Sequence, residues 1–460
     1  TADEIIHRQI SVQHLEKKII FCHRFLYCAK ESGLNEIDFE KIPVFLEKQS
    51  CSKNTSVIFR ILFLFSTASV LGFLFIYFFP YYSSIPLLIW IVYITAFLFL
   101  RNTVSDSLDL AVDIQHILKA LLPLLTLIEK HKVPKKNPLH SLFSLFQTGN
   151  SRPSLHYSKL NWIIAALSIR THPLVYYLIH SIFPWDFYFA LKLEKQRKNL
   201  LPLMQKWTNA LHEMDALVSL AVFAHIKSTW TYPQPLENND SRILHAIQIG
   251  HPLLFQSECA ECVPNDFILN REKRIQLITG SNMSGKSTFL RTVGINLILA
   301  KLGAKVCSQS FFWKYLEPYS CMRITDQLET HASYFYAEVS RLYDLLNAAK
   351  NFDHTNAILL IDEIFKGTNN RERYIGAKNY IEAICQTSAY AIITTHDLEL
   401  TELENIYPSL ANLHFEEQFQ NNQLSFDYKI KRGPCKSTNA LLIMSSIGLP
   451  ITTTNNGNNT

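Results

Sequence analysis

The spacing of hydrophobic and polar positions predicts helices in the first half of the chain. Residues 1–50 carry apolar side chains at helical intervals among charges. Residues 103–147 are typical of a long amphipathic helix followed by a connector. Residues 154–230 continue the helical pattern, with breaks at Pro173 and Pro184. We therefore expect an all-α region before residue 236.

Two long apolar runs interrupt this pattern and predict a transmembrane hairpin. Residues 57–79 contain one charge, Arg60, and residues 85–100 contain none. Positive residues lie before the first run and, as Arg101, after the second, whereas the connecting turn has none. By the positive-inside tendency, both ends of the hairpin over residues 57–100 face the cytosol. The alternative is a buried helical pair inside a soluble domain.

A third segment, residues 160–189, is also strongly apolar. Arg170, Pro173, Pro184 and Asp186 interrupt it, and such residues are rare within spans. We therefore expect a buried helical core here.

Composition and charge limit the classes of protein. Hydrophobic residues make up 48% of the chain and charged residues 18%, which excludes a disordered protein. The net charge of +5 is compatible with a phosphate-rich partner. The basic run at residues 130–136 is either a solvated loop or a contact for phosphates or lipid headgroups.

The nine cysteines are scattered, so we expect free thiols, and Cys259 and Cys262 form a CxxC without a second pair.

The second half contains a phosphate-binding loop in the required context. A β-branched run at residues 274–279 predicts a strand, and an amphipathic helix is predicted from Thr288 to about Lys301. Between them Gly280-Ser281-Asn282-Met283-Ser284-Gly285-Lys286-Ser287 matches GxxxxGK[ST]. The backbone of this loop and Thr288 can cradle phosphates of ATP. Lys286 should reach the β- and γ-phosphates, and the Ser287 hydroxyl should ligate Mg²⁺.

Two further predicted strands end in residues suited to hydrolysis. The apolar run at residues 357–361 leads into Asp362 and Glu363. Asp362 can hold the magnesium, and Glu363 can act as general base toward an attacking water. The run at residues 390–395 leads into His396, which can sense the γ-phosphate. Because parallel strands present ligand sites at their carboxyl ends, we expect these segments to meet.

These motifs resemble the ATPase domain of MutS proteins, within the ABC-type ATPase superfamily. The resemblance rests on residues 280–288, on Asp362-Glu363-Ile364 with Gly367-Thr368, and on Thr395-His396. Weaker similarities extend it over roughly residues 195–450. They lie at Gly250-His251-Pro252, Ala332–Glu338, Gly433–Pro450 and Glu213–Ala221.

The resemblance implies a homodimer that sandwiches ATP between two ATPase domains. Ser333 of one protomer would reach the γ-phosphate held by the other, and Asn265 would lie near the adenine. It also implies ATP-gated contact with DNA. Cys262 stands where the family has an adenine-stacking aromatic, and it cannot stack.

Other departures from the family favour a membrane-anchored MutS-like branch. The chain has no room upstream for a mismatch-reading domain, and Phe45-Leu46-Glu47 matches the Phe-x-Glu wedge outside its usual context. Phe365-Lys366 stands where many members carry Gly-Arg. A polar tail follows Pro450 in place of the family's helix-turn-helix.

The predicted fold is an α/β P-loop ATPase of the ABC/MutS type with a mostly parallel sheet, preceded by an all-α core and a two-helix transmembrane hairpin. The expected divisions are 1–56 (helical segment), 57–100 (hairpin), 101–235 (helical core or clamp), 236–450 (ATPase) and 451–460 (disordered tail).

The predicted function is an ATPase at the inner or cytoplasmic membrane, with its ATPase domain in the cytoplasm. It would hydrolyse Mg-ATP as a dimer to drive clamp-like binding of DNA, either branched or without sequence preference. The first alternative is an ATP switch that binds a protein partner. A transporter is disfavoured because two apolar runs are few for a translocation path.

Overall fold

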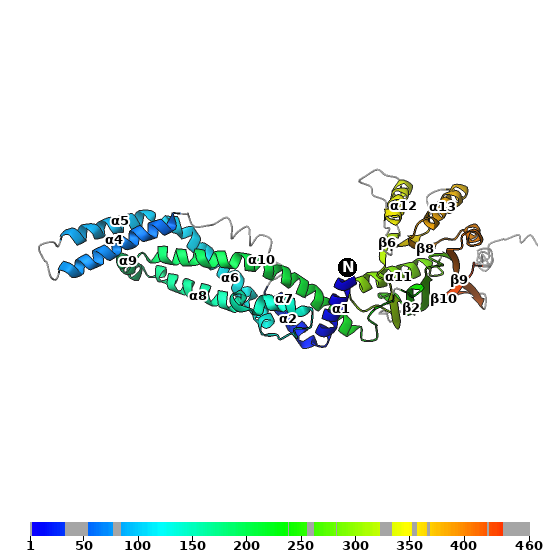
Figure 1. The fold of residues 1–460 in the computed structure, drawn as a ribbon, viewed down its shortest axis with the longest axis horizontal. Helices are drawn as coiled ribbons and strands as arrows, with labels where there is room; N and C mark the ends of the chain where they lie inside the picture. Colours follow the sequence, from blue (N-terminus) through cyan, green and yellow to red (C-terminus); the bar gives the residue numbers. More distant parts are fainter. Residues whose placement is uncertain are drawn as a thin grey trace, which may run out of the picture. The chain divides into compact units, whose positions relative to one another are not determined.

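The computed structural model describes residues 2–32, 54–76, 84–237, 239–254, 262–281, 283–322, 334–351, 357–365, 369–420 and 423–435. Their contacts divide the chain into two compact units. The helical unit is Ile10–Val222, and the sheet unit combines Thr1–Gln9 with Phe223–Thr460 (Figure 1). Residues 223–235 and the first turns of the chain therefore pack with the strands.

The helical unit is built from helices and their connectors, as the sequence predicted. In chain order they are α1 (Ala2–Glu16, from Ile10), α2 (Ile19–Glu31), α4 (Thr55–Ile76), α5 (Ser84–Leu100), α6 (Asn102–Lys130), α7 (Leu139–Gln147), η2 (Gly149–Ser151), α8 (Pro153–Leu167), η3 (Ser168–Thr171), α9 (Pro173–Ile182) and α10 (Trp185–Ile226). Helix α6 packs against α2, α7 and α8. Phe146 of α7 stacks on Trp207 of α10 with ring centroids 6.3 Å apart, and both rings are buried.

Helices α4 and α5 pack side by side (Figure 1). They do not form a buried pair, because Leu64 and Leu88 are each 65% exposed and many of their apolar neighbours are also exposed. Among the described helices, Thr55–Phe75 of α4 is long and apolar enough to cross a bilayer, and Ser84–Leu100 is apolar but shorter. Pro153–Thr171 and Pro173–Ile182 are a further apolar pair, bent by 110°.

The prediction of a buried core over residues 160–189 is wrong for α9. His180 is the buried residue of that helix, whereas Leu174 is 89% exposed. Apolar sequence alone does not reveal this outcome, because a helix in a core and a helix with its apolar side outward have the same composition.

The sheet unit contains a six-stranded and a four-stranded sheet. Its elements are β1 (Gln234–Pro235), β2 (Arg242–Ile249), β3 (Asn265–Asn270), β4 (Ile275–Thr279), α11 (Lys286–Lys301), β5 (Ser310–Trp313), β6 (Glu317–Cys321), α12 (Tyr334–Asn351), β7 (Ala357–Asp362), α13 (Asn370–Cys385), β8 (Tyr390–Thr394), η5 (Leu398–Glu402), α14 (Leu403–Ile406), β9 (Leu410–Gln420) and β10 (Gln423–Arg432). The smaller sheet has the order β1-β5-β2-β3.

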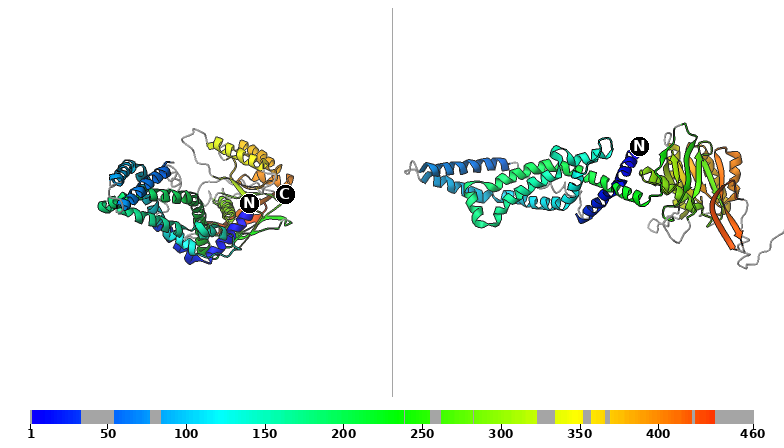
Figure 2. Two further views of the ribbon diagram at one scale, coloured as in Figure 1. Left: turned by 60° about the vertical axis from the view of Figure 1, so that its left-hand side comes forward. Right: turned by 90° about the horizontal axis from the view of Figure 1, so that it is seen from below.

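The larger sheet has the order β10-β9-β4-β8-β7-β6, and all its pairs are parallel except β10 with β9. This confirms the expected mostly parallel sheet, and the strands predicted at residues 274–279, 357–361 and 390–395 are β4, β7 and β8. Strands β4, β7 and β8 are almost wholly buried, as expected when helices cover both faces. Figure 2 gives two further views of this layered unit.

Helix α11 covers one face of this sheet, and α12 and α13 cover the other. Leu360 of β7 faces the cluster that contains α11, and its neighbour Leu359 faces the cluster of α12 and α13. Gly294 allows α11 to lie close to β7, because an added Cβ would meet Leu360 Cδ1 at 2.9 Å. This close packing fixes the amino terminus of α11 beside the ends of the central strands.

Candidate nucleotide-binding site

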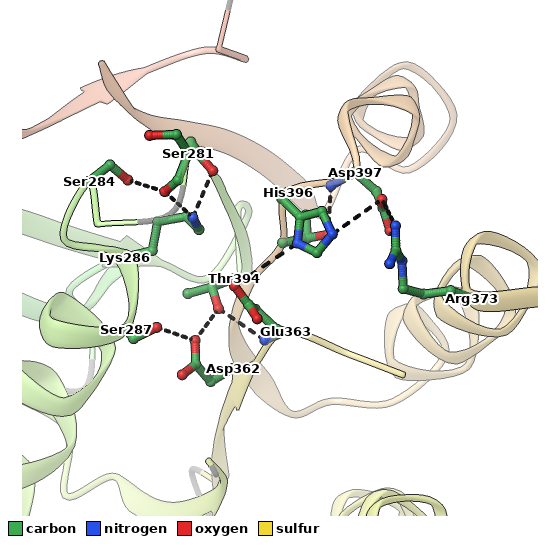
Figure 3. Close-up of polar contacts among 12 residues, drawn as sticks. Ser281, Ser284, Lys286, Ser287, Asp362, Glu363, Arg373, Thr394, His396 and Asp397 are labelled. Carbon is green, nitrogen blue, oxygen red and sulfur yellow. Dashed lines mark hydrogen bonds and ion pairs between the residues drawn. The ribbon is translucent and has the colours of Figure 1, made fainter. Parts of the chain in front are cut away.

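The parallel strands bring the three predicted catalytic segments to one edge of the sheet. Strand β8 pairs with β4 on one side and with β7 on the other, so Thr394 lies opposite both Ile278 and Asp362. The phosphate-binding loop follows β4, Glu363 follows β7, and His396 lies just beyond β8. The expected meeting of these segments is confirmed (Figure 3).

The loop depends on two glycines with positive φ. Gly280 has φ 146° and Gly285 has φ 105°, a region that side chains rarely adopt. A Cβ at Gly280 would also lie 2.8 Å from the Phe415 carbonyl oxygen. Gly285 is the N-cap of α11. The first turn of α11 therefore presents backbone N–H groups where phosphates are favoured.

Lys286 is 4% exposed, and its ammonium is held inside the loop. Its Nζ donates hydrogen bonds to the carbonyl oxygens of Gly280 at 2.7 Å and of Ser281 at 2.6 Å. Burial lowers the pKa of Lys286, and the nearby carboxylates of Glu363 and Asp362 act in the opposite direction. A buried cation whose partners are neutral carbonyls fits a site for an anion such as a phosphate.

Ser287 and Asp362, the two predicted magnesium ligands, lie next to each other. The Ser287 Oγ donates to Asp362 Oδ1 at 2.8 Å, and the Thr394 Oγ1 donates to the same oxygen at 2.6 Å. No group of three or more His, Cys, Asp or Glu side chains could hold a metal among the described residues. One hydroxyl with one carboxylate fits Mg²⁺, which usually takes its other ligands from substrate phosphates and water.

Glu363 follows in a backbone conformation unusual for its residue type. Its φ is 53°, and such strain is often kept at functional sites. Its N–H lies 3.1 Å from both the carbonyl oxygen and the Oγ1 of Thr394. The Glu363 side chain is 13% exposed and lines the cavity beside Lys286. The carboxylate is therefore placed beside the phosphate-binding loop.

His396 lies on the far side of Glu363, with its Nδ1 4.0 Å from Glu363 Oε1. The segment behind it is fixed by an ion pair that the sequence did not reveal. Arg373 of α13 donates from Nε and from a terminal nitrogen to the two oxygens of Asp397, at 2.9 and 2.7 Å (Figure 3). This two-point contact holds the loop that carries His396.

A cavity of about 560 Å³ adjoins the loop, a volume typical of sites for small ligands. Lys286, Ser287, Thr288 and Glu363 line one part of it. Met283, another loop residue, is 86% exposed, and Ser284 donates through Oγ to the Ser281 carbonyl oxygen at 2.9 Å. Asn282 and Ser333 lie outside the described residues.

The other part of the cavity contains Cys262, Asn265 and Tyr428. Asn265 uses its amide on the backbone of β10. Its Nδ2 donates to the Tyr428 carbonyl oxygen at 3.0 Å, and its Oδ1 accepts from the Ile430 N–H at 2.8 Å. Asn265 thus positions Tyr428. The aromatic ring of Tyr428 can stack on an adenine base, which Cys262 cannot do. Sequence reasoning missed Tyr428, because its place depends on the pairing of β10 with β9.

Thr394 is fully buried, and its hydroxyl donates to the Asp362 carboxylate and accepts from the Glu363 backbone N–H. We expect Thr394→Val to raise the Mg²⁺ concentration required for half-maximal ATP hydrolysis and to slow hydrolysis roughly 10-fold or more. A hydrogen bond to a charged group contributes about 1.5–3 kcal/mol, and each 1.36 kcal/mol is about tenfold in rate.

Thr394→Ser is the matched control because it keeps the hydroxyl. Steady-state phosphate release over a Mg²⁺ titration would measure both variants, with thermal unfolding to verify folding. If Thr394→Val and Thr394→Ser behave alike, the Thr394 hydroxyl does not organise Asp362 and the backbone of Glu363.

Comparison with known proteins agrees with this geometry. Residues 276–460 match the family profile of MutS domain V. This segment is similar to MutS. The DNA mismatch repair protein MutS of Staphylococcus epidermidis is 31% identical over 268 residues, which cover 58% of this chain and 30% of that protein. The corresponding proteins of S. haemolyticus and S. saprophyticus are each 30% identical, over 58% of this chain and 29% of their own lengths.

The chain thus spans about 30% of the length of these MutS relatives. MutS domain V is a P-loop ATPase domain, and residues 276–460 of this chain are similar to it. The resemblance inferred from the loop, Asp362-Glu363 and His396 is therefore supported at this level.

Proposed function

We propose that this protein is a membrane-anchored MutS-like ATPase that binds and hydrolyses Mg-ATP in a homodimer and uses this cycle to close on DNA. One observation carries the proposal. Lys286 and Ser287 at the start of α11 meet Asp362 and Glu363 at the end of β7, at the carboxyl edge of a parallel sheet and beside one cavity.

Each of these residues has a distinct chemical role. Lys286 exchanges its carbonyl partners for the β- and γ-phosphates of ATP. Ser287 and Asp362 hold Mg²⁺, which neutralises phosphate charge when bound. Glu363 accepts a proton from the attacking water, and His396 contacts the γ-phosphate.

The homodimer supplies the second half of each ATP site. Ser333 of one protomer reaches the γ-phosphate that the other protomer holds. The support is the likeness of residues 332–338 to the signature-helix region of MutS, together with the match to domain V. A subunit-mixing experiment for this proposal is given in the Discussion.

Residues 57–100 anchor the protein in the inner or cytoplasmic membrane, with the ATPase domain (236–450) in the cytoplasm. Support comes from the length of the apolar part of α4 and from the exposed apolar side chains on both α4 and α5. Arg60 and Arg101 lie at the same end of the two-helix pair, as expected for a hairpin with both ends in the cytoplasm.

DNA is the proposed polymer ligand. The relatives are named DNA mismatch repair proteins, and the chain carries a net charge of +5. Lys130, Lys132, Lys135 and Lys136 are all exposed and available to phosphates. The proposed binding favours branched or bent duplexes over a single mismatch.

The test uses the full chain in nanodiscs of neutral lipid and fluorescence anisotropy of labelled duplexes. We expect branched DNA to bind more tightly than linear DNA, with affinity that falls steeply as salt rises. ATP should change the affinity of wild type but not that of Lys286→Ala, the matched control for the nucleotide effect. Negligible binding of every duplex at low salt would contradict the DNA proposal and favour a protein partner.

A further inference from the structure

Helix α9 turns its polar side toward the protein and its apolar side outward, the opposite of a helix at the surface of a soluble protein. His180 is 1% exposed and Tyr176 is partly buried, whereas Leu174 is 89% and Leu178 is 66% exposed. Val175 and Ile182 are exposed as well. Exposing this much apolar surface to water is unfavourable, because transfer of apolar surface out of water is the main favourable term in folding. The arrangement is favourable where the surroundings are themselves apolar.

A buried polar cluster fixes α9 in this orientation. Asp186 of α10 is fully buried, and its Oδ2 accepts from an Arg170 terminal nitrogen at 2.9 Å and from the Tyr176 hydroxyl at 3.2 Å. Its Oδ1 lies 3.3 Å from His180 Nε2. Since breaking any of these contacts would leave a buried carboxylate short of partners, α9 cannot rotate its leucines inward without a large penalty.

Helix α9 is also attached to the α4–α5 pair. Its last carbonyl groups have no partners within the helix, and side chains of the pair supply them. Tyr93 donates to the His180 carbonyl oxygen at 2.7 Å and Trp90 to that of Ser181 at 3.0 Å, while Ser66 of α4 donates to that of Ile182. Phe183 packs edge-on against Phe59 and Phe63 of α4. The exposed apolar face of α9 is thus continuous with that of α4 and α5.

The start of α9 lies beside the end of α5. Tyr176, near the start of α9, lies against Phe97 near the end of α5, with ring centroids 6.5 Å apart. Arg170 and His172 precede α9, and Arg101 follows α5, so positive or polar residues gather at the same end. From that end α9 extends along the pair for 10 residues, about 15 Å, or half of a bilayer core of about 30 Å.

We infer that α9 is a third membrane-embedded element, a half-length helix whose Leu174 and Leu178 contact lipid acyl chains beside α4 and α5. The inference rests on the proposed membrane anchor. The 110° bend between α8–η3 and α9 is the turn at which the chain enters the apolar layer. Arg170 and the Tyr176 hydroxyl, on either side of this turn, bind Asp186 Oδ2 inside the protein, as membrane depth favours for polar groups.

The experiment uses the full-length protein in lipid vesicles with a fluorescent amino acid encoded at one position at a time. Positions 178 and 174 report on α9, and position 88 on α5 reports on the proposed anchor. Position 141 is the matched control, because Ser141 is exposed on α7. Lipids with brominated acyl chains quench probes within the bilayer, and iodide quenches probes in water.

The inference predicts that brominated lipid reduces the emission at 178, 174 and 88, and that iodide reduces it only at 141. Iodide quenching at 178 and 174, with lipid quenching retained at 88, would overturn the α9 inference and leave the anchor intact. Quenching of 178 and 174 by neither reagent would mean that protein covers α9, which also overturns it. Iodide quenching at 88 as well would contradict the proposed anchor itself.

Discussion

Glu363→Gln should retain ATP and hydrolyse it roughly 10²-fold or more slowly than wild type, the scale of a lost general base. Glutamine keeps the size of glutamate but cannot accept a proton. The backbone contacts of Glu363 to Thr394 do not involve the changed atoms, so the loop after β7 should keep its shape. Binding should survive because Lys286 and the phosphate-binding loop are untouched.

Single-turnover phosphate release, with filter binding of labelled ATP in parallel, would separate the two effects. Glu399→Gln is the matched control, since Glu399 is exposed and is not among the residues that line the cavity. It should hydrolyse ATP at the wild-type rate. Unchanged hydrolysis in Glu363→Gln would falsify the assignment of Glu363 as the base.

Mixing two inactive variants should restore activity if the ATP site is shared between protomers. Neither Lys286→Ala nor Ser333→Ala homodimers contain a complete site. A mixed dimer pairs the intact Lys286 of one protomer with the intact Ser333 of the other, and so holds one complete and one doubly altered site. Random exchange makes about half of the dimers mixed, so up to about a quarter of wild-type hydrolysis should return if sites act independently.

Coupling between the two sites would lower this recovery, so the decisive result is its presence. Phosphate release would be measured after exchange, with exchange itself verified by energy transfer between differently labelled protomers. Each variant alone, carried through the same protocol, is the control. Verified exchange without any recovery would remove Ser333 from the site.

The sequence predicted those parts of the site that follow one another along the chain. The loop at residues 280–287 lies between a β-branched strand and an amphipathic helix, and local propensity with glycine spacing is enough to place it. Asp362, Glu363 and His396 were likewise identified from the strands that precede them. Their convergence followed from the geometry of parallel strands, and the sheet order confirms it.

Residues whose place depends on distant pairings were not predicted. Thr394 contacts the Asp362 carboxylate and the Glu363 N–H because β8 pairs with β7, and Tyr428 reaches the cavity only through β10. Asn265 was expected near the adenine. Its side-chain amide is hydrogen-bonded to the backbone of β10 in the wall of the cavity. The orientation of α9 depends on the contacts of Tyr176 and His180 with Asp186 of α10. The sequence around Asp186 does not indicate these contacts.

The central claim is that Lys286 holds the phosphates of Mg-ATP in this cavity. The most direct measurement is calorimetric titration of ATP into the full-length protein and into Lys286→Ala, each with and without Mg²⁺. We predict Mg²⁺-dependent binding to wild type that weakens by about 10-fold to 100-fold in Lys286→Ala, the loss expected for hydrogen bonds to a charged group. Equal affinity of wild type and Lys286→Ala for Mg-ATP would contradict the account.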